Sequence, residues 1–488
     1  MALSSDETRV LSGVRTDLYL GGEWQPSASG RTLPVEDPAT GEPIAEVADA
    51  TPEEGLAALG SAAAHQAEWA ATAPRQRGEI LRKAFELMVR RSDDLALLMT
   101  LEMGKPVAES KGEVTYAAEF LRWFSEEAVR VDGRYGLSPA GDSRLLVLKQ
   151  PVGPCLFITP WNFPLAMGTR KIGPAVAAGC TMVVKPAKQT PLSMLALAGI
   201  LEEAGLPKGV LSVLTASSAG ALTGPLLKDP RLRKLSFTGS TEVGRQLVRD
   251  SADQLLRTSM ELGGNAPFLV FDDADLDKAV EGALLAKMRN MGEACTAANR
   301  FHVHASVADE FTRRLAEAMG GLRVGRGTEP GVQVGPLIDE AGRGKVEELV
   351  ADAVDHGAKP AVGGSRTDGP GYFFPPTVLG GVEPGSRILA EEVFGPVAPV
   401  ATFESDDEAI MAANATEFGL VSYAYTGSWD RAMRVIDGLE SGMVGLNRGL
   451  VSNPAAPFGG VKQSGFGREG GPEGIQEYLD VKYVSAPR

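Results

Sequence analysis

Apolar side chains recur every three to four positions through much of the first 130 residues, which is the spacing of amphipathic helices. This pattern predicts helices over residues 57–71, 76–91 and 109–129, with a break at Gly104-Lys105-Pro106. Residues 18–24 indicate a strand and a turn, whereas residues 1–17 are mostly polar and are expected to form a loose lead-in.

From Gly153 onward the pattern changes to short apolar runs that alternate with helical stretches. The first series predicts strands 155–159, 182–185, 211–214 and 234–237, with helices 192–204 and 220–227. A second series predicts strands 267–271, 301–304, 397–403, 422–426 and 443–447, with helices 276–290, 307–319, 343–356 and 431–439. This alternation is typical of parallel sheets, so two α/β domains are predicted.

Residues 144–149 fit neither series, because their polar and apolar positions alternate poorly. We interpret them as an excursion that joins the sheet of another subunit. The last strand-like stretch, residues 475–484, is a candidate to pair with them.

The composition is that of a folded globular protein, with 43% hydrophobic and 23% charged residues in 488. A chain of this length is expected to divide into two or three domains. The net charge of −15 argues against nucleic acid or an anionic membrane as a partner. The first residues lack a signal-peptide pattern, and no apolar run approaches the ~20 residues of a membrane span.

The chain has only three cysteines, too few for a disulfide framework, which favours the cytoplasm. Cys155 and Cys180 lie in apolar runs, where a cysteine is usually a small buried hydrophobe. Cys295 lies instead among small and polar residues, a setting that suits a reactive thiol. A nucleophile also needs a base and a site for the developing anion, so the interpretation of Cys295 depends on its companions.

A possible phosphate site follows predicted strand 234–237, where Gly239 and Ser240 open a helix. A glycine turn into a helix N-terminus can receive a phosphate, although this segment departs from the usual G-x-G-x-x-G pattern. Ser240 could equally be no more than a helix cap.

Other polar residues also follow predicted strands, at the edge where α/β sheets bind ligands. Lys185 and Lys188 end one strand, although solvated lysines are an equally simple interpretation. Asn162 lies between two prolines and could donate to an oxyanion. Glu261 precedes a double glycine and could be a general base or merely a surface turn residue.

Taken together, these segments resemble motifs of the NAD(P)-dependent aldehyde dehydrogenase superfamily. They occur along this chain in the same order as in that family. The motifs that carry the resemblance are Pro160-Trp161-Asn162-Phe163-Pro164, Lys185-Pro186, Phe237-Thr238-Gly239-Ser240, Glu261-Leu262-Gly263-Gly264, Cys295, Glu392-Val393-Phe394-Gly395-Pro396 and Pro457-Phe458-Gly459-Gly460. The resemblance implies an α/β fold with a Rossmann-type cofactor domain, an α/β catalytic domain and a small β oligomerisation arm. The implied divisions are 18–131 with 151–262, 263–450, and 132–150 with 470–488.

The resemblance implies a mechanism for three of these residues. Cys295 would attack the aldehyde carbon as a thiolate, and the side chain of Asn162 with the backbone N–H of Cys295 would hold the oxyanion. After hydride transfer to the nicotinamide, Glu261 would activate the water that hydrolyses the thioester. No metal is expected.

The resemblance also implies which residues bind the cofactor: Trp161, Lys185, Lys188, Gly239, Ser240, Leu262, Glu392 and Phe394. Lys188 departs from the pattern, because NAD-preferring members often have a glutamate there that accepts hydrogen bonds from the adenosine ribose. A lysine cannot accept, but it can neutralise a 2′-phosphate. We therefore predict a preference for NADP, with NAD possible as a second cofactor.

The residues around Arg170, Arg289 and Ser452 are similar to those of succinate-semialdehyde dehydrogenases, in which the matching side chains bind the substrate carboxylate. Phe163 and Phe458 would line the same pocket. Guanidinium groups suit a carboxylate, so a small anionic aldehyde is predicted, most simply succinate semialdehyde. From spacing alone, however, either arginine could be a solvated helix residue. Glutarate semialdehyde and a sulfonated aldehyde remain alternatives.

Three further expectations concern regulation, chemistry and assembly. Ala297 stands where several succinate-semialdehyde dehydrogenases carry a second cysteine, so no local disulfide switch is expected. A CoA-acylating enzyme is an alternative that Glu261 disfavours, and a catalytically silent binding protein on the same fold is another. An extending strand favours a homodimer or a homotetramer.

Overall fold

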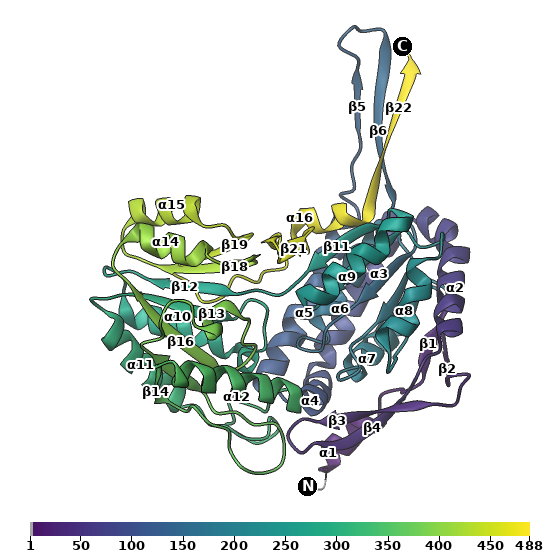
Figure 1. The fold of residues 1–488 in the computed structure, drawn as a ribbon. Helices are drawn as coiled ribbons and strands as arrows, with labels where there is room; N and C mark the ends of the chain where they lie inside the picture. Colours follow the sequence, from purple (N-terminus) through teal and green to yellow (C-terminus); the bar gives the residue numbers. More distant parts are fainter. Residues whose placement is uncertain (1–2) are drawn as a thin grey trace.

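The structure, a computed structural model, describes residues 3–488 and contains two large sheets side by side (Figure 1). The first has eight strands in the order β2 (Glu23–Gln25), β1 (Leu18–Leu20), β9 (Leu211–Val213), β8 (Met182–Lys185), β7 (Cys155–Ile158), β10 (Lys234–Thr238), β11 (Arg257–Glu261), β21 (Gly465–Phe466). Its five central strands are parallel, and every residue of β7, β8 and β10 is buried. Burial on both faces explains why β7 and most of β8 are continuous apolar runs, whereas β10 also contains the buried polar residues Lys234 and Ser236.

Helices cover both faces of this sheet. They are α2 (Pro52–Ala71), α3 (Pro74–Arg90), α4 (Ser92–Met103), α5 (Val107–Glu127), α6 (Ala166–Ala178), α7 (Leu192–Ala204), α8 (Ala219–Leu227) and α9 (Thr241–Ser251), followed by the short turn η1 (Ala252–Gln254). The start of α2 shows how the sequence sets a boundary: Thr51 and Glu54 form a reciprocal capping box, and Pro52 takes the first helical position.

The second sheet has seven strands in the order β14 (Lys359–Val362), β15 (Thr377–Gly380), β16 (Val397–Phe403), β13 (Ala298–His304), β12 (Ala266–Val270), β18 (Val421–Tyr425), β19 (Met443–Leu446). All neighbours are parallel except β14 and β15. Its helices are α10 (Leu276–Met288), α11 (Ala308–Gly320), α12 (Glu340–Asp355), α13 (Arg387–Ala390), α14 (Asp406–Asn414) and α15 (Trp429–Gly438).

A three-stranded ribbon projects away from both sheets (Figure 1). It consists of β5 (Arg134–Leu137), β6 (Ser143–Pro151) and β22 (Leu479–Pro487), which follows α16 (Gly471–Gly474) and η3 (Ile475–Tyr478). The expected pairing between the excursion and the last residues is confirmed, since β6 and β22 run antiparallel from Leu479↔Pro151 to Pro487↔Ser143. The apolar side chains of Tyr135, Leu137, Val481 and Tyr483 are exposed on this ribbon.

The expectation of a loose lead-in at residues 1–17 is wrong for residues 5–12, which form a helix, and residues 1 and 2 lie outside the described residues. Ser4 and Glu7 form a capping box at the start of helix α1 (Ser5–Ser12), which lies against α4. The Glu7 carboxylate is buried, with Oε1 2.8 Å from Arg326 Nη1 in the other half of the molecule. Val10 is buried and Leu11 packs against the core, so ion pairs and a short apolar face together hold the helix in place.

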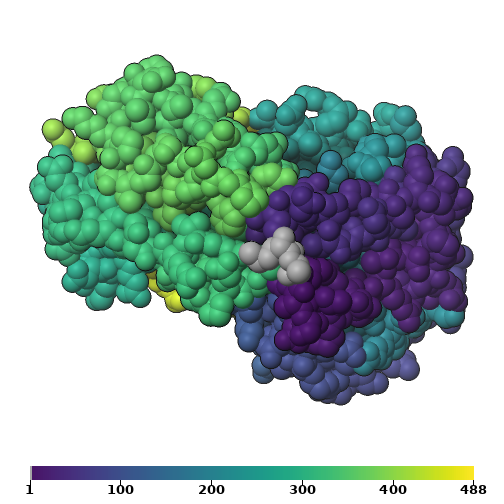
Figure 2. Space-filling model, turned by 90° about the horizontal axis from the view of Figure 1, so that it is seen from below, coloured from purple at the N-terminus to yellow at the C-terminus, as the bar shows by residue number. Residues whose placement is uncertain are grey.

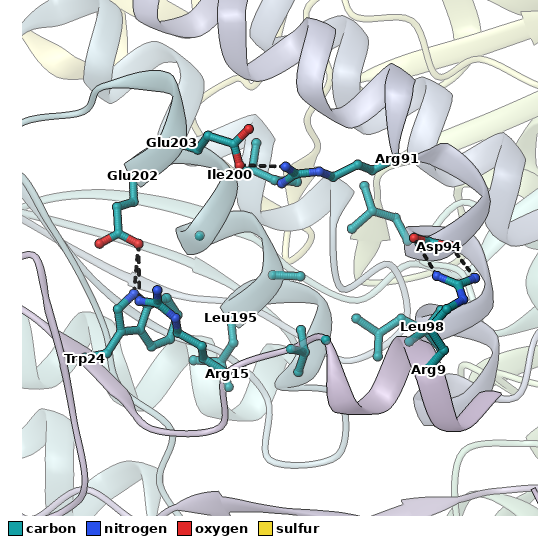
Figure 3. Close-up of a pocket in the computed structure, with 16 residues that line it drawn as sticks. Arg9, Arg15, Trp24, Arg91, Asp94, Leu98, Leu195, Ile200, Glu202 and Glu203 are labelled. Carbon is teal, nitrogen blue, oxygen red and sulfur yellow. Dashed lines mark hydrogen bonds and ion pairs between the residues drawn. The ribbon is translucent and has the colours of Figure 1, made fainter. Parts of the chain in front are cut away.

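Two further ion pairs hold this segment over α4 and α7 (Figure 3). Arg9 donates to both carboxylate oxygens of Asp94, and Arg15 lies 3.5 Å from Glu202. Beneath them is a cavity of about 630 Å³ with an apolar floor that includes Leu98, Leu195 and Ile200. Figure 2 shows this N-terminal segment, in dark purple, beside the green second half at the waist of the molecule.

Several boundaries also differ from the sequence prediction. The helix expected over 276–290 ends at Met288, because Asn290 and Met291 adopt left-handed backbone conformations. The helix expected from 343 begins at Glu340, where the Asp339 side chain accepts a hydrogen bond from Gly342 N. Elements that we did not predict include α4 and two small ribbons, β3 (Thr32–Asp37) with β4 (Glu42–Ala48) and β17 (Phe418–Gly419) with β20 (Val461–Lys462).

Candidate active site

Cys295 lies between the turn η2 (Arg289–Gly292) and strand β13, on the side of the second sheet that faces the first. The turn is tight because Asn290, Met291 and Gly292 are consecutive left-handed residues, with φ of 55°, 54° and 79°. Only glycine fits at 292, since a Cβ there would lie 2.1 Å from the carbonyl oxygen of Gly395. This turn places Cys295 in a cleft between the two halves of the molecule.

Asn162 approaches the same loop from the first half, in the segment that joins β7 to α6. Its Nδ2 donates a hydrogen bond of 3.0 Å to the carbonyl oxygen of Glu293, two residues before Cys295. An amide nitrogen carries two hydrogens, so a second N–H remains available. The structure therefore brings two of the three predicted catalytic residues together.

Glu261 is the last residue of β11 and is 3% exposed. Neither of its carboxylate oxygens has a hydrogen-bond partner among residues 3–488. Burial, together with the charge of Glu469, raises the pKa of Glu261 well above its usual value, against the attraction of Arg170 and Lys171. A carboxylate with a raised pKa is a stronger base, which suits proton abstraction from water.

These three residues line one cavity of about 340 Å³. Nine of the predicted site residues contribute to its wall: Trp161, Asn162, Gly239, Ser240, Glu261, Leu262, Cys295, Glu392 and Phe394. The other predicted residues lie outside this wall: Phe163, Arg170, Lys185, Lys188, Arg289, Ser452 and Phe458.

The Cys295 thiol is held mainly in its protonated form. Burial raises its pKa to about 12, and the negative charges of Glu392 and Glu261 add to this rise. Arg170, and more weakly Arg289, act in the opposite direction by favouring the thiolate. Both arginines therefore lie within electrostatic reach of the sulfur, although neither lines the cavity.

Arg170 is held within α6, 2% exposed. Its Nε lies 2.6 Å from Glu469 Oε2, and its guanidinium carbon lies 3.8 Å from the centre of the Phe458 ring. Its Nη2 is buried and has no hydrogen-bond partner in the part of the chain that the structure describes. A buried donor without a partner is unfavourable unless a ligand satisfies it.

Arg289 stacks on a different aromatic side chain. Its guanidinium carbon lies 4.6 Å from the ring centre of Phe163 and 5.8 Å from that of Tyr116. Tyr116 in turn contacts Phe120, with ring centres 5.0 Å apart, and Arg170 lies 5.9 Å from Phe120. The two arginines therefore flank one aromatic cluster. Ser452 is half-buried between β19 and β20, and its role stays a prediction.

The opposite end of the cleft contains the predicted phosphate turn. Ser240 caps α9 by accepting a hydrogen bond from Val243 N, so its capping role is real. Glu392 forms the neighbouring wall, where its Oε1 accepts a hydrogen bond of 3.1 Å from Gly264 N, and burial raises its pKa to about 7. A helix N-terminus, a close-packed glycine and a half-buried carboxylate suit the pyrophosphate and ribose of a dinucleotide.

Lys185 and Lys188 lie beside this end of the cleft. Lys185 is buried at the end of β8, and its pKa falls to about 8 because of burial and the nearby charge of Lys188. Lys188 lines a second cavity of about 350 Å³ together with Ser217, Glu36 and Glu102. This cavity meets the first at Ile338 and Asp339, which line both.

Sequence reasoning missed one whole wall of the cleft, formed by Ile338, Asp339, Ala341, Gly342 and Lys345. The available clue was Asp339, whose position before a helix is typical of an N-cap. It also missed Glu469, which pairs with Lys171 Nζ at 2.6 Å as well as with Arg170. Such a pairing across 298 positions leaves no local trace in the sequence.

Residues 3–488 were considered for two further features, a membrane-spanning helix and a metal site. No helix there is long and apolar enough to cross a membrane. The same residues contain no group of three or more His, Cys, Asp or Glu side chains arranged to hold a metal ion.

Comparison with known proteins identifies the family of this chain. The sequence model of the aldehyde dehydrogenase family matches residues 24–484. The chain belongs to this family. It is therefore an oxidoreductase that acts on a small aldehyde with a nicotinamide cofactor, and the resemblance found in the sequence is confirmed.

Several curated family members are highly similar in sequence. Succinate-semialdehyde dehydrogenase of Paenarthrobacter nicotinovorans is 63% identical over 441 residues, 90% of this chain and 98% of that protein. Glutarate-semialdehyde dehydrogenase of Pseudomonas aeruginosa is 52% identical over 96% of this chain and 97% of its own length. The NADP+ succinate-semialdehyde dehydrogenase GabD of Escherichia coli is 50% identical with the same coverage.

Solved structures agree with the fold of this aldehyde dehydrogenase. An NADP-dependent enzyme from E. coli has a TM-score of 0.96 at 49% identity and 99% coverage of both chains. Betaine aldehyde dehydrogenase from Staphylococcus aureus, solved with NAD+, also has a TM-score of 0.96, at 33% identity, covering 99% of this chain and 98% of its own. The predicted fold class is thus confirmed.

Proposed function

We propose that this aldehyde dehydrogenase oxidises succinate semialdehyde to succinate with NADP. The observation that carries the proposal is the buried Nη2 of Arg170, which lacks a partner among residues 3–488 although its guanidinium influences the Cys295 thiol. A substrate carboxylate would satisfy this donor while its aldehyde end reaches the sulfur. The succinate-semialdehyde dehydrogenases among the relatives support this choice.

In the proposed mechanism, Glu261 takes the proton from the Cys295 thiol and passes it to solvent, and the resulting thiolate attacks the aldehyde carbon to form a carbon–sulfur bond. The carbonyl oxygen becomes an oxyanion, which the free N–H of Asn162 and the backbone N–H of Cys295 stabilise, each by about 10²–10³ in rate. A bound nicotinamide supplies the hydride acceptor. The resulting thioester on Cys295 is then hydrolysed by water.

Glu261 is the base for that hydrolysis. It takes a proton from water as the oxygen attacks the thioester carbon, and the carbon–sulfur bond then breaks to release the acid and the Cys295 thiolate. The absence of any hydrogen bond to its carboxylate, within the described chain, leaves both oxygens available to water.

The preference for NADP is proposed from Lys188. Lys185 already has a lowered pKa partly because Lys188 is near, so the region favours a negative group. A 2′-phosphate beside Lys188 and Ser217 would relieve that repulsion. Glu36 and Glu102 also line this cavity. Each carboxylate oxygen of Glu102 already accepts a hydrogen bond, one from Leu192 N and one from Ser193 N.

The two sheets and the projecting ribbon suit three different roles. We propose that residues 18–131 and 151–262 bind the cofactor and that residues 263–450 supply the thiol. The ribbon of 132–150 and 470–488 would join copies of the chain into a homodimer or homotetramer, because it exposes apolar side chains on projecting strands. The low cysteine content supports a place in the cytoplasm.

One comparison tests the proposal: kcat/KM for succinate semialdehyde, glutarate semialdehyde, a sulfonated aldehyde and butanal, each with NADP and NAD. We expect succinate semialdehyde with NADP to be highest. A higher value for another anionic aldehyde would replace the substrate, and an equal value for butanal would exclude the anion site. A requirement for CoA would exclude hydrolysis by Glu261.

A further inference from the structure

Asn290 is a fully buried residue at the start of the left-handed turn before Cys295. Its Nδ2 donates two hydrogen bonds, one of 3.1 Å to the carbonyl oxygen of Asn162 and one of 2.9 Å to that of Glu293. One side-chain amide therefore joins the backbone of the loop that carries Asn162 to the backbone of the loop that carries Cys295.

The backbone of Asn290 is held as firmly as its side chain. Its N–H donates 2.5 Å to Glu109 Oε2, and its carbonyl oxygen accepts 2.8 Å from Glu293 N. A left-handed conformation at a residue other than glycine is unfavourable and persists only where the surroundings fix it. These contacts supply that constraint.

The Asn162 carbonyl has a second donor, Lys105 Nζ, at 2.7 Å. Lys105 is 1% exposed and pairs with Glu113 Oε2 at 2.6 Å. The other oxygen of Glu113 accepts hydrogen bonds from Leu165 N and Ala166 N, the residues that start α6. The buried pair thus holds the Asn162 segment through a second donor to the same carbonyl oxygen.

We infer that Asn290 is a positioning residue that fixes the distance between the Asn162 side-chain amide and the backbone N–H of Cys295. A hydrogen bond to an oxyanion depends strongly on distance and angle, so two donors on separate loops need a connection between those loops. Asn290 provides it, and Lys105 anchors the same carbonyl. This inference rests on the proposed roles of Asn162 and Cys295 as oxyanion donors.

The test is a double-mutant cycle on the full chain with succinate semialdehyde and NADP. Asn290→Gly keeps the left-handed backbone accessible but removes the amide. We expect kcat/KM to fall about 10–10²-fold, mostly in kcat, because misplaced oxyanion donors lose transition-state stabilisation. In an Asn162→Ala background, the same change should lower kcat/KM by less than about 2-fold, because the donor it positions is gone.

Two measurements separate positioning from damage to the fold. The Kd for NADP and the rate of Cys295 alkylation by iodoacetamide should stay within about 2-fold of wild type, since neither forms an oxyanion. Asn447→Gly is the matched control, because Asn447 is also left-handed, with φ 51°, its side chain hydrogen-bonds to the backbone of Thr426, and neither residue lines the cleft. It should leave kcat/KM unchanged.

Wild-type kcat/KM for Asn290→Gly, or an equal loss in both backgrounds, would overturn the inference. If Asn290→Gly does not fold, Lys105→Met takes its place in the same cycle, with the same two outcomes. If the wild type prefers another aldehyde, the cycle is run with that aldehyde, because every aldehyde forms the oxyanion. Full activity of Asn162→Ala would instead overturn both the proposed role of Asn162 and this inference.

Discussion

Arg170 Nε lies 2.6 Å from Glu469 Oε2, and both side chains are buried. Glu469 also holds Lys171 at 2.6 Å, so one carboxylate orients two neighbouring cations of α6. This ion pair uses one edge of the guanidinium and leaves Nη2 without a partner among the described residues. Glu469 thereby orients the guanidinium of Arg170.

Replacing Arg289 by Leu should separate charged from uncharged aldehydes. Removing one partner of a buried charged pair typically costs ~2–5 kcal/mol. We therefore expect KM for succinate semialdehyde to rise about 30-fold or more, since each ~1.4 kcal/mol is a factor of ten. KM for butanal should change by less than about 3-fold, because it has no carboxylate to lose. Equal effects on both substrates in steady-state kinetics would exclude Arg289 from the anion site.

The pKa of the Cys295 thiol should respond in opposite directions to two substitutions. Arg170→Leu removes a positive charge that favours the thiolate, so the pKa should rise further. Glu392→Gln removes a negative charge that opposes it, so the pKa should fall. The measurement is the pH dependence of alkylation by iodoacetamide, which increases as pH rises through the thiol pKa. A shift of both variants in the same direction would contradict this assignment.

Lys188→Glu should reverse the cofactor preference. A glutamate repels the 2′-phosphate and can accept hydrogen bonds from the ribose hydroxyls of NAD. Because a hydrogen bond to a charged group contributes ~1.5–3 kcal/mol, the ratio of kcat/KM for NADP over NAD should fall by at least about tenfold. Lys208→Glu, at an exposed site, is the matched charge reversal and should leave the ratio unchanged. An unchanged ratio in Lys188→Glu would show that another residue selects the cofactor.

Arg326 should matter for stability far more than Arg9. Arg326 is 11% exposed and bridges Glu7 at 2.8 Å and Asp37 at 2.9 Å, both buried. Arg326→Leu leaves two buried carboxylates without their cation, a change that costs about 3–5 kcal/mol. Arg9→Ala breaks only a pair between exposed side chains, which solvent screens, so it should change the melting temperature much less. Thermal unfolding of both variants checks this, and similar melting temperatures would disprove it.

Oxidation should inactivate Cys295 without forming an internal disulfide. Cys155 and Cys180 are fully buried, and position 297 is an alanine. After peroxide treatment, intact-mass and peptide analysis should find oxygen added to Cys295, and Ala297→Cys should gain a dithiothreitol-reversible lock. Reversible inactivation of the wild type with Cys295 linked to Cys155 or Cys180 would contradict the prediction.

Much of the fold could be predicted because burial on both faces produces unbroken apolar runs. Strand β8 and helix α7 begin and end at the residues that the pattern indicated, 182–185 and 192–204. Helix α1 was not predicted although the capping box of Ser4 and Glu7 is a local signal, because its apolar positions are few and contacts such as Glu7 with Arg326 lie far apart in the sequence. Propensity and periodicity report local preference and not a partner far along the chain.

The candidate site shows the same limit. Residues with a distinctive local sequence could be predicted, and residues that act through distant contacts could not. Cys295, Glu261 and Asn162 stood out because their residue types suit the chemistry and their neighbours are distinctive. Glu469 and Asn290 did not, since each acts by holding a backbone or side chain that only folding brings near. Their residue types are unremarkable without those contacts.

The ribbon of β5, β6 and β22 cannot be completed until β22 has been synthesised. Its first two strands leave the ribosome early, yet β6 pairs along its whole length with the last nine-residue strand of the chain. Until β22 has been synthesised, the hairpin of β5 and β6, which carries Tyr135 and Leu137, has an open edge. The nascent protein is therefore open to aggregation along β6 during that interval, and a truncation before Leu479 would make that state permanent.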